Sequence, residues 1–293
     1  MVILFIMQLF FGISTLITKH FLLYIDPLIF TFLKLSMGFV YSVLYYKPHV
    51  YILLQTYKAH YKKMLFIVFV GICPKYLLKY WSMQYLSLAH ITCVYHTTPA
   101  VTVLVSYILY GKSICYRQGV GVILSFLGIV LCTVCTRDFV VINYSLICLF
   151  GAVIAHSMSM LYMQEMVNRS VPLSAVLVIT LFLSAVLSAL IATIGSSAMQ
   201  YESVSINWIF FWILGFMGFK TAVYHYYQYW ALGHYSAVCI SLIEYLGPLI
   251  GCGYGYWVMG EIITGQQIMG LVITGIGMYI FYCGDQQKQY SFS

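Results

Sequence analysis

Four lysines and one glutamate lie inside long apolar runs of this 293-residue sequence: Lys34, Lys75, Lys79, Lys220 and Glu244. A charge at the centre of a membrane-spanning helix costs roughly 2.5–3.5 kcal/mol, so each should face a cavity or a partner. The excess of lysines favours a solute with a carboxylate or a phosphate. Glu244 could receive an amino group of that solute or carry a coupling proton. Alternatively, Lys34 and Lys79 could snorkel to an interface, and Lys220 and Glu244 could form a structural ion pair.

Aromatic and imidazole side chains in the same apolar runs extend the predicted substrate-binding site. These candidates are Tyr95, His96, His156, Tyr224 and Tyr227. Such rings can stack on a solute or hydrogen-bond to it, although each could equally be a packed core residue. Tyr224 and Tyr227 belong to the aromatic run 224–230, which could stack the base of a nucleotide-like, purine-containing solute or form an interfacial aromatic belt.

No catalytic residue and no metal site are predicted. The sequence has no HExxH, GxSxG or P-loop motif and no paired carboxylates, and its histidines are scattered over different apolar runs. Cys132 and Cys135 form an isolated CxxC, a weak sign of metal or redox chemistry. We therefore expect a protein that is not an enzyme and has no cofactor, with coupling to protons or to a counter-substrate left open. A channel or a scaffold is the remaining alternative class.

The elements that position these residues are membrane helices. Hydrophobic residues make up 62% of the chain and charged residues only 7%, whereas a soluble domain carries about 25% charged residues. Because a spanning helix needs roughly 20 apolar residues, the pattern predicts an all-α integral membrane protein with ten transmembrane helices. The predicted segments are 2–18, 27–46, 64–86, 88–110, 118–136, 145–166, 172–194, 207–231, 235–259 and 267–283, with one long polar interruption at 47–63.

The basic residues in the loops predict the orientation. With a cytoplasmic N-terminus, the inside loops and tail hold eight Lys and Arg residues, while the outside loops hold Lys19 and Arg137. An excess of positive charge on the inside predicts both termini in the cytoplasm. We expect a multi-pass protein of a bacterial cytoplasmic membrane. Its expected partners are the lipid bilayer and a small-molecule solute, with a homodimer left open and nucleic acid excluded.

An internal repeat divides the chain into residues 1–139 and 140–293. Sliding the sequence on itself by 149 residues aligns ten identical pairs over 49 positions, including Tyr80 with Tyr229 and Trp81 with Trp230. Each half contains five predicted helices, and since five is odd, the second half should enter the membrane in the opposite sense. Inverted-topology repeats are typical of secondary transporters, whose site lies near the membrane midplane.

The same register aligns candidate hinges and gates. Pro99 corresponds to Pro248, and each should remove one helical hydrogen bond near the middle of a helix. Small residues follow at spacings of four, and in the second half Gly247 and Gly251 begin this ridge. Such ridges allow close packing of helices in lipid, and they could also be seams where gates slide. The repeat also aligns the column Gly71, Lys75 and Lys79 with residues 220, 224 and 228, so both columns should border one cavity.

These motifs resemble the drug/metabolite transporter superfamily, in its EamA-like branch. In the second half the motif residues are Pro248, Gly260, Glu261, Gln267, Gly270 and Gly277, and in the first they are Pro99, Gly111, Lys112, Gln118, Gly121 and Gly128. Lys112 departs from the usual glutamate, and Lys34 stands where the family has an arginine. The resemblance implies ten helices in inverted repeats and transport of a small solute by alternating access. The family's solutes range from amino acids to nucleotide precursors, so the resemblance does not choose the substrate.

Overall fold

Every element in the described part of the chain is a helix. The computed structural model describes residues 2–95, 97–111, 115–133, 139–195, 208–235, 237, 240, 253–258, 260 and 263–290. The main elements are α1 (Val2–Phe21), α2 (Pro27–Tyr46), α3 (Val50–Phe66), the π-helix η1 (Ile67–Ile72), α4 (Cys73–Tyr85), α5 (Leu88–Tyr95), α6 (Thr98–Tyr110), α7 (Tyr116–Thr133), α8 (Phe139–Asn168), α9 (Leu173–Gly195), α10 (Trp208–Leu232) and α13 (Gly265–Tyr290).

Five of the described helical stretches are long and apolar enough to cross a membrane. They are Pro27–Tyr46, Val50–Tyr85, Tyr144–Asn168, Leu173–Gly195 and Gly265–Gly284. Large apolar side chains are also exposed on the outside of the molecule, among them Leu44, Ile108 and Ile194. Exposed apolar surface of this extent suits lipid rather than water. The chain is therefore a multi-pass helical membrane protein.

Local interactions of the flanking residues set both ends of helix α2. Asp26 accepts a hydrogen bond from the backbone N–H of Leu28 at 2.7 Å, and Pro27 occupies the first turn, where it lacks only an N–H that would be unpaired anyway. At the other end, Lys47 has a φ of 42°, and Pro48 follows. A left-handed residue followed by proline cannot continue the helix. The predicted segment 27–46 is confirmed.

The prediction that residues 47–63 form a polar loop is wrong. Helix α3 begins at Val50 and leads through η1 into α4, so the chain is helical from 50 to 85. Only His60, with φ −130° and ψ 15°, departs from helical geometry within α3. Hydropathy reports where a helix enters lipid, whereas the backbone hydrogen bonds continue into the polar part. Charged side chains therefore extend a helix beyond the apolar segment without ending it.

The single helix predicted over 88–110 is broken into α5 and α6. Helix α5 ends at Tyr95, and α6 begins at Thr98 with Pro99 in its first turn. The Thr97 and Thr98 hydroxyls donate to the carbonyls of Val94 and Tyr95 at 2.6 Å each, which satisfies groups at the end of α5. Pro99 therefore starts a helix instead of kinking one in the middle, because its ring is compatible with a first turn.

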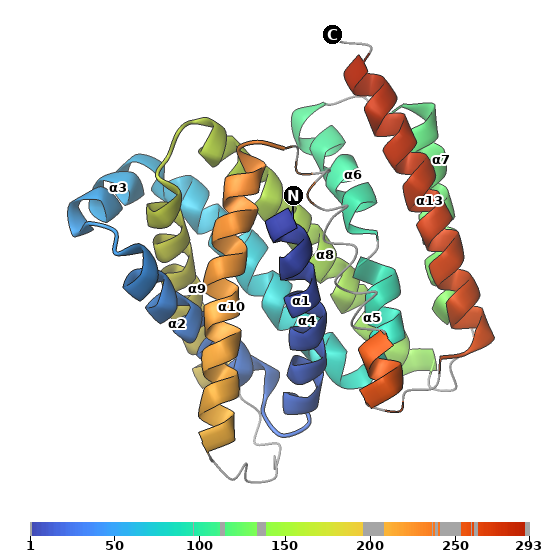
Figure 1. Ribbon diagram of the computed structural model, residues 1–293, viewed down its shortest axis with the longest axis horizontal. Coiled ribbons are helices and arrows are strands. Elements are labelled where there is room, and N and C mark those ends of the chain that lie inside the picture. The colour runs from blue at the N-terminus through green and yellow to red at the C-terminus, as the bar shows by residue number, and fades with distance from the viewer. Residues whose placement is uncertain are drawn as a thin grey trace.

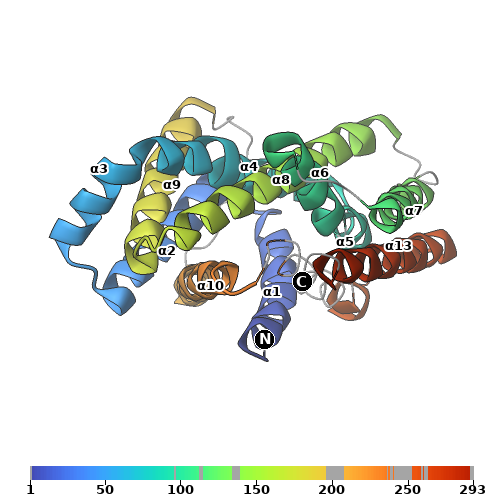
Figure 2. The same ribbon diagram turned by 90° about the horizontal axis from the view of Figure 1, so that it is seen from above.

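The helices gather into two groups joined by a central layer. Figure 1 shows α2, α3, α9 and α10 on one side and α5, α6, α7 and α13 on the other, with α1, α4 and α8 between them. Figure 2, seen from above, shows the same arrangement, with α8 crossing the molecule from the side of α7 to the side of α2. Helices α7 and α13, from near the ends of the first and second halves of the chain, thus lie side by side.

Helices α7 and α13 pack at van der Waals distance through glycines. A Cβ placed on Gly121 would lie 2.6 Å from the carbonyl oxygen of Gly277, and one on Gly128 would lie 2.6 Å from that of Gly270. Between these contacts, the Thr274 hydroxyl donates to the carbonyl of Ser125 at 3.4 Å. Ser125 and Thr274 are 149 residues apart, as are the aligned pairs of the repeat. This close contact between small residues was not among the ridges predicted from the sequence, and the predicted ridge that begins at Gly247 and Gly251 lies outside the described residues.

Candidate functional site

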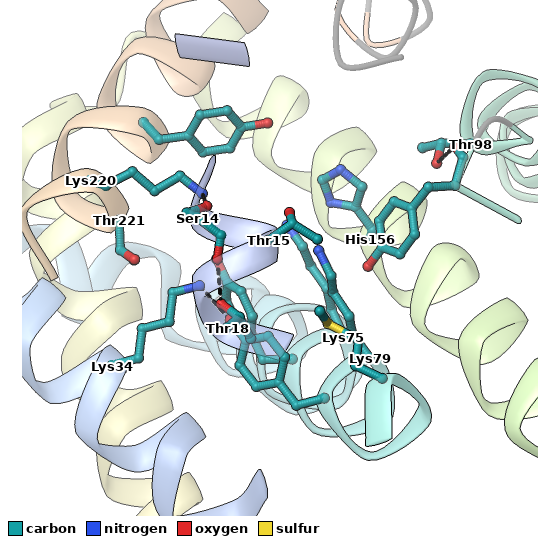
Figure 3. Close-up of a pocket in the computed structure, with 15 residues that line it drawn as sticks. Ser14, Thr15, Thr18, Lys34, Lys75, Lys79, Thr98, His156, Lys220 and Thr221 are labelled. Carbon is teal, nitrogen blue, oxygen red and sulfur yellow. Dashed lines mark hydrogen bonds between the residues drawn. The ribbon is translucent and has the colours of Figure 1, made fainter. Parts of the chain in front are cut away.

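A small polar cavity lies at the centre of the molecule. Helices α1, α2, α4, α5, α6, α8 and α10 all contribute to its wall, and its volume is about 30 Å³. Figure 3 shows its labelled residues pointing toward one another from these helices. Its wall is formed by Ser14, Thr15, Thr18, Lys34, Lys75, Tyr76, Lys79, Tyr80, Met83, Tyr95, Thr98, His156, Lys220, Thr221 and Tyr224.

All four lysines predicted at membrane depth line this cavity. Lys34 comes from α2, Lys75 and Lys79 come from α4, and Lys220 comes from α10. Their exposed fractions are only 4% to 7%, so none of them reaches the outer surface. The snorkelling alternative for Lys34 and Lys79 is therefore wrong. The lysines come together although they are up to 186 positions apart in the sequence.

Each lysine ammonium also lies over a tyrosine ring. The distances from Nζ to the ring centroid are 4.7 Å for Lys34 and Tyr76, 5.1 Å for Lys34 and Tyr80, 5.2 Å for Lys75 and Tyr76, 4.6 Å for Lys79 and Tyr95, and 5.4 Å for Lys220 and Tyr224. A cation over the face of an aromatic ring is attracted by the ring's quadrupole, by up to about 2 kcal/mol when desolvated. The rings thus stabilise the ammonium groups in the cavity without adding negative charge.

Hydroxyl groups on α1 form the part of the wall that the sequence analysis missed. Lys220 Nζ donates to the Ser14 hydroxyl at 2.8 Å, and Thr18 donates to the carbonyl of Ser14 at 2.7 Å. Thr15 lies beside them (Figure 3). The three residues lie at i, i+1 and i+4 within the apolar stretch between Leu9 and Ile17 and the turn that follows it, and this spacing is the signal that could have identified them.

Other missed residues support the lysines or complete the wall. Lys34 Nζ donates to the Tyr80 hydroxyl. At the far end, Thr98 lines the wall together with the predicted His156, and the neighbouring Thr102 hydroxyl donates to that of Ser157 at 3.0 Å. Met83, Tyr76 and Thr221 also line the wall and carried no spacing signal of their own.

A buried hydrogen-bond chain connects the cavity wall to α10. The Tyr76 hydroxyl lies 2.8 Å from His225 Nε2, and His225 Nδ1 lies 3.1 Å from the side-chain oxygen of Gln228. An amide oxygen only accepts, so Nδ1 carries the proton and Nε2 accepts from Tyr76. Tyr76 and His225 are again 149 residues apart. The contact joins α4 directly to α10.

The predicted column of Gly71, Lys75 and Lys79 is only partly correct. Lys75 and Lys79 face the cavity. Gly71 lies in η1, and a Cβ at this position would come within 2.5 Å of the Ser159 Cβ on α8. The wider turns of a π-helix change the spacing, so Gly71 packs against α8 instead of continuing the lysine face.

The other sequence-predicted candidates fall into three groups. Tyr95, His156 and Tyr224 line the cavity. Tyr227 is not among the described lining residues; its ring packs edge-on against Tyr226, with the centroids 5.8 Å apart. The remaining candidates, His96, Glu244, Gly247, Pro248 and Gly251, lie outside the described residues.

Within the aromatic run 224–230, only Tyr224 reaches the cavity. Tyr226 stacks on Tyr46 of α2 with the ring centroids 4.2 Å apart, and Trp230 packs against His234 at 4.4 Å. The described residues also contain no group of three or more His, Cys, Asp or Glu side chains that could hold a metal ion. What the cavity offers a ligand is ammonium groups, hydroxyls and aromatic faces.

Comparison with known proteins identifies the family. The EamA-like transporter family matches residues 1–134 and 143–283, two halves of the chain. A solved structure described only as the crystal structure of a protein has a TM-score of 0.67 at 14% identity, covering 95% of this chain and 94% of its own. No curated protein matches the sequence. The solved structure shows a shared fold, the two family matches are consistent with an internal repeat, and the chain belongs to the EamA-like transporter family, within the drug/metabolite transporter superfamily.

Proposed function

We propose that the protein is a secondary active transporter that moves a small polar solute across a membrane by alternating access. The observation that carries this proposal is the buried polar cavity, which is enclosed by apolar helices and lined by four lysines. Burying polar groups at this depth costs free energy unless they bind a solute or one another. Family membership supports transport of a small solute. The solute that we expect is an anionic or zwitterionic metabolite such as an amino acid.

Movement of the two halves against each other would provide the alternating access. Residues 149 positions apart meet twice, as Tyr76 with His225 and as Ser125 with Thr274. Residues at equivalent positions of two repeats can touch each other only near the pseudo-two-fold axis that relates the repeats. Both contacts therefore support two five-helix repeats of inverted topology. Lys34, Lys75 and Lys79 belong to the first half and Lys220 to the second. Relative movement of the halves would thus reshape the cavity.

The small cavity volume fits an occluded stage of such a cycle. A volume of about 30 Å³ holds roughly two water molecules, since one water needs about 10–15 Å³ on this measure. A metabolite would enter only after the halves separate on one side. Pro99 and Pro248, with the small residues Gly247 and Gly251, are the proposed hinge and gate positions. Glu244 is the proposed site for an amino group or a coupling proton, and both termini are proposed to lie in the cytoplasm.

Uptake by purified protein in liposomes tests the proposal. Radiolabelled amino acids, phosphorylated metabolites and dicarboxylates are offered with and without a counter-solute or a proton gradient. We expect saturable uptake of at least one, abolished by Lys220→Gln. Lys62→Gln removes the same charge from an exposed position on α3 and should leave uptake unchanged. Equal uptake by Lys220→Gln and the unmodified protein would refute the site, and single-channel currents in place of saturable flux would refute the transporter.

A further inference from the structure

The cavity is continued on one side by a seam between the two halves of the chain. Lys75 contributes to the wall from α4 in the first half, and His156 contributes from α8 in the second half. Beyond these residues, α4 leads back through η1 into α3, and α8 lies beside α4 and η1 (Figure 2). A movement of the halves that opens the cavity toward α3 must therefore separate α8 from η1 and α3.

Two contacts close this seam next to the cavity. Gly71 lies in η1, where a Cβ would come within 2.5 Å of the Ser159 Cβ on α8, so the two helices touch without room for a side chain at this position. Further out, the rings of Phe66 and Tyr162 pack with their centroids 4.4 Å apart. Both contacts join the first half to the second, and they place backbone and apolar atoms between the cavity and the α3 end of the molecule.

An ion pair lies at the outer end of the seam. Lys63 Nζ donates to the Glu165 carboxylate, and the two side chains are 29% and 32% exposed. Contact positions in the first half fall from 71 to 66 to 63, while those on α8 rise from 159 to 162 to 165, as expected of antiparallel neighbours. Glu165 lies nine residues beyond His156, or about 13 Å along α8. The ion pair thus joins the two halves where water reaches the seam.

The corresponding seam of the other half is wider. In the 149-residue register, Gly71 corresponds to Lys220 on α10. Lys220 reaches α1 through its long side chain, which donates to the Ser14 hydroxyl, and Phe21 of α1 meets Phe210 with the ring centroids 5.8 Å apart. Long side chains bridge α1 and α10 here, whereas η1 and α8 touch at a glycine. The two seams are therefore closed by different kinds of contact.

We propose that Lys63 and Glu165 form the latch of a gate between η1 and α8, and that this gate closes the cavity toward α3. The inference rests on the proposed alternating access, because it names the contact that breaks when the cavity opens at this end. The ion pair suits that role because it is partly exposed, so water solvates both charges as soon as they separate. A deeply buried pair would make the same movement far less favourable.

Arg169 provides a matched control for the latch. Its guanidinium bonds to the same Glu165 oxygen at 2.9 Å, but both residues belong to the second half. Lys63→Gln therefore removes a bond across the seam, and Arg169→Gln removes a bond of the same kind within one half. Only the first substitution should ease the separation of the halves.

Hydrogen exchange of the purified full-length protein measures this opening without requiring transport. Backbone amides of η1 and of residues 155–165 should exchange more rapidly when the seam opens more often. We expect Lys63→Gln and Glu165→Gln to speed their exchange by about two- to fivefold, since fivefold corresponds to about 1 kcal/mol, the upper value for an exposed pair. Arg169→Gln should leave the rates unchanged. Equal rates for Lys63→Gln and Arg169→Gln would overturn the latch.

A covalent bond in place of the ion pair tests its role in transport. A water-soluble carbodiimide activates the Glu165 carboxylate, and the adjacent Lys63 amine then displaces the urea and forms an amide. We expect uptake by liposomes to fall in proportion to the fraction of chains that carry this amide, which mass spectrometry of the joined peptides measures. Glu165→Gln cannot form the amide and should keep, after the same treatment, the uptake that it had before.

The outcomes keep the two proposals separate. An equal change of uptake in both treated proteins would overturn the latch and leave the transporter standing. No flux of any labelled solute through the untreated protein would refute transport, and the exchange comparison would still decide the latch. Where a variant fails to fold, the treated unmodified protein decides, because full uptake by chains that carry the amide would overturn the latch.

Discussion

The seam between α7 and α13 leaves no room for a methyl group at Gly121, and Gly121→Ala tests this packing. The new Cβ would lie 2.6 Å from the Gly277 carbonyl oxygen and 2.7 Å from the backbone nitrogen of Phe281. The first distance is 0.8 Å shorter than the 3.4 Å at which ordinary contacts begin. Both opposing atoms belong to the backbone of α13, so relief requires the helices to separate. A gap of about 0.5–1 Å forfeits a quarter to a half of each dispersion contact along the seam.

We therefore expect Gly121→Ala to destabilise the protein by about 1–3 kcal/mol, the usual range for overpacking. At roughly 2–4 °C per kcal/mol, the midpoint of thermal unfolding in detergent should fall by about 2–12 °C. Gly119→Ala is the matched control, because it lies in the same helix and a Cβ there meets no atom within 4 Å. Its midpoint should stay the same or rise slightly. Equal midpoints for the two variants would refute the packing argument.

Two other contacts make further predictions. Tyr76→Phe removes the bond to His225 and should lower the free energy of unfolding by about 0.5–2 kcal/mol, measured by thermal or denaturant unfolding in detergent; an unchanged value would show that the bond contributes nothing. Glu165→Gln breaks the pairs with Lys63 and Arg169, which are partly exposed, so the loss should be below about 1 kcal/mol. That loss should shrink between 0.1 M and 1 M salt, where the Debye length falls from about 10 Å to 3 Å; a loss independent of salt would contradict a screened ion pair.

Hydropathy and charge predicted the parts of the structure that depend on the membrane. The bounds of α2 and α9 follow from apolar length and from turn residues at their ends, and both helices lie within one residue of the predicted segments. Lys34, Lys75, Lys79 and Lys220 were recognisable as cavity residues because lipid makes an isolated charge so unfavourable. The sequence thus identified the cationic groups before any contact between helices was known.

Features that depend on local backbone geometry were not predictable in this way. The extension of α3 to Val50 and the break between α5 and α6 leave little trace in hydropathy, since the polar part of a helix and a loop have similar composition. Thr15 and Tyr76 line the cavity because of how α1 and α4 are rotated, and neutral side chains carry no penalty large enough to reveal that rotation. Tyr227 was predicted in the cavity because an aromatic ring in an apolar run can stack on a solute, but it is not among the described lining residues and its ring packs against Tyr226.

The number of residues in the π-helix η1 determines where the cavity lysines of α4 point. A helix advances about 100° per residue, so deleting one residue within Ile67–Ile72 would turn α4 by about that angle relative to α3. Lys75 and Lys79 would then leave the cavity although neither had been mutated. Helix α10 is α-helical from Trp208 to Leu232 and has no corresponding wide turn. The two halves thus hold their cavity residues on different kinds of helix, with two lysines on α4 after a π-helical turn and one lysine on an uninterrupted α10.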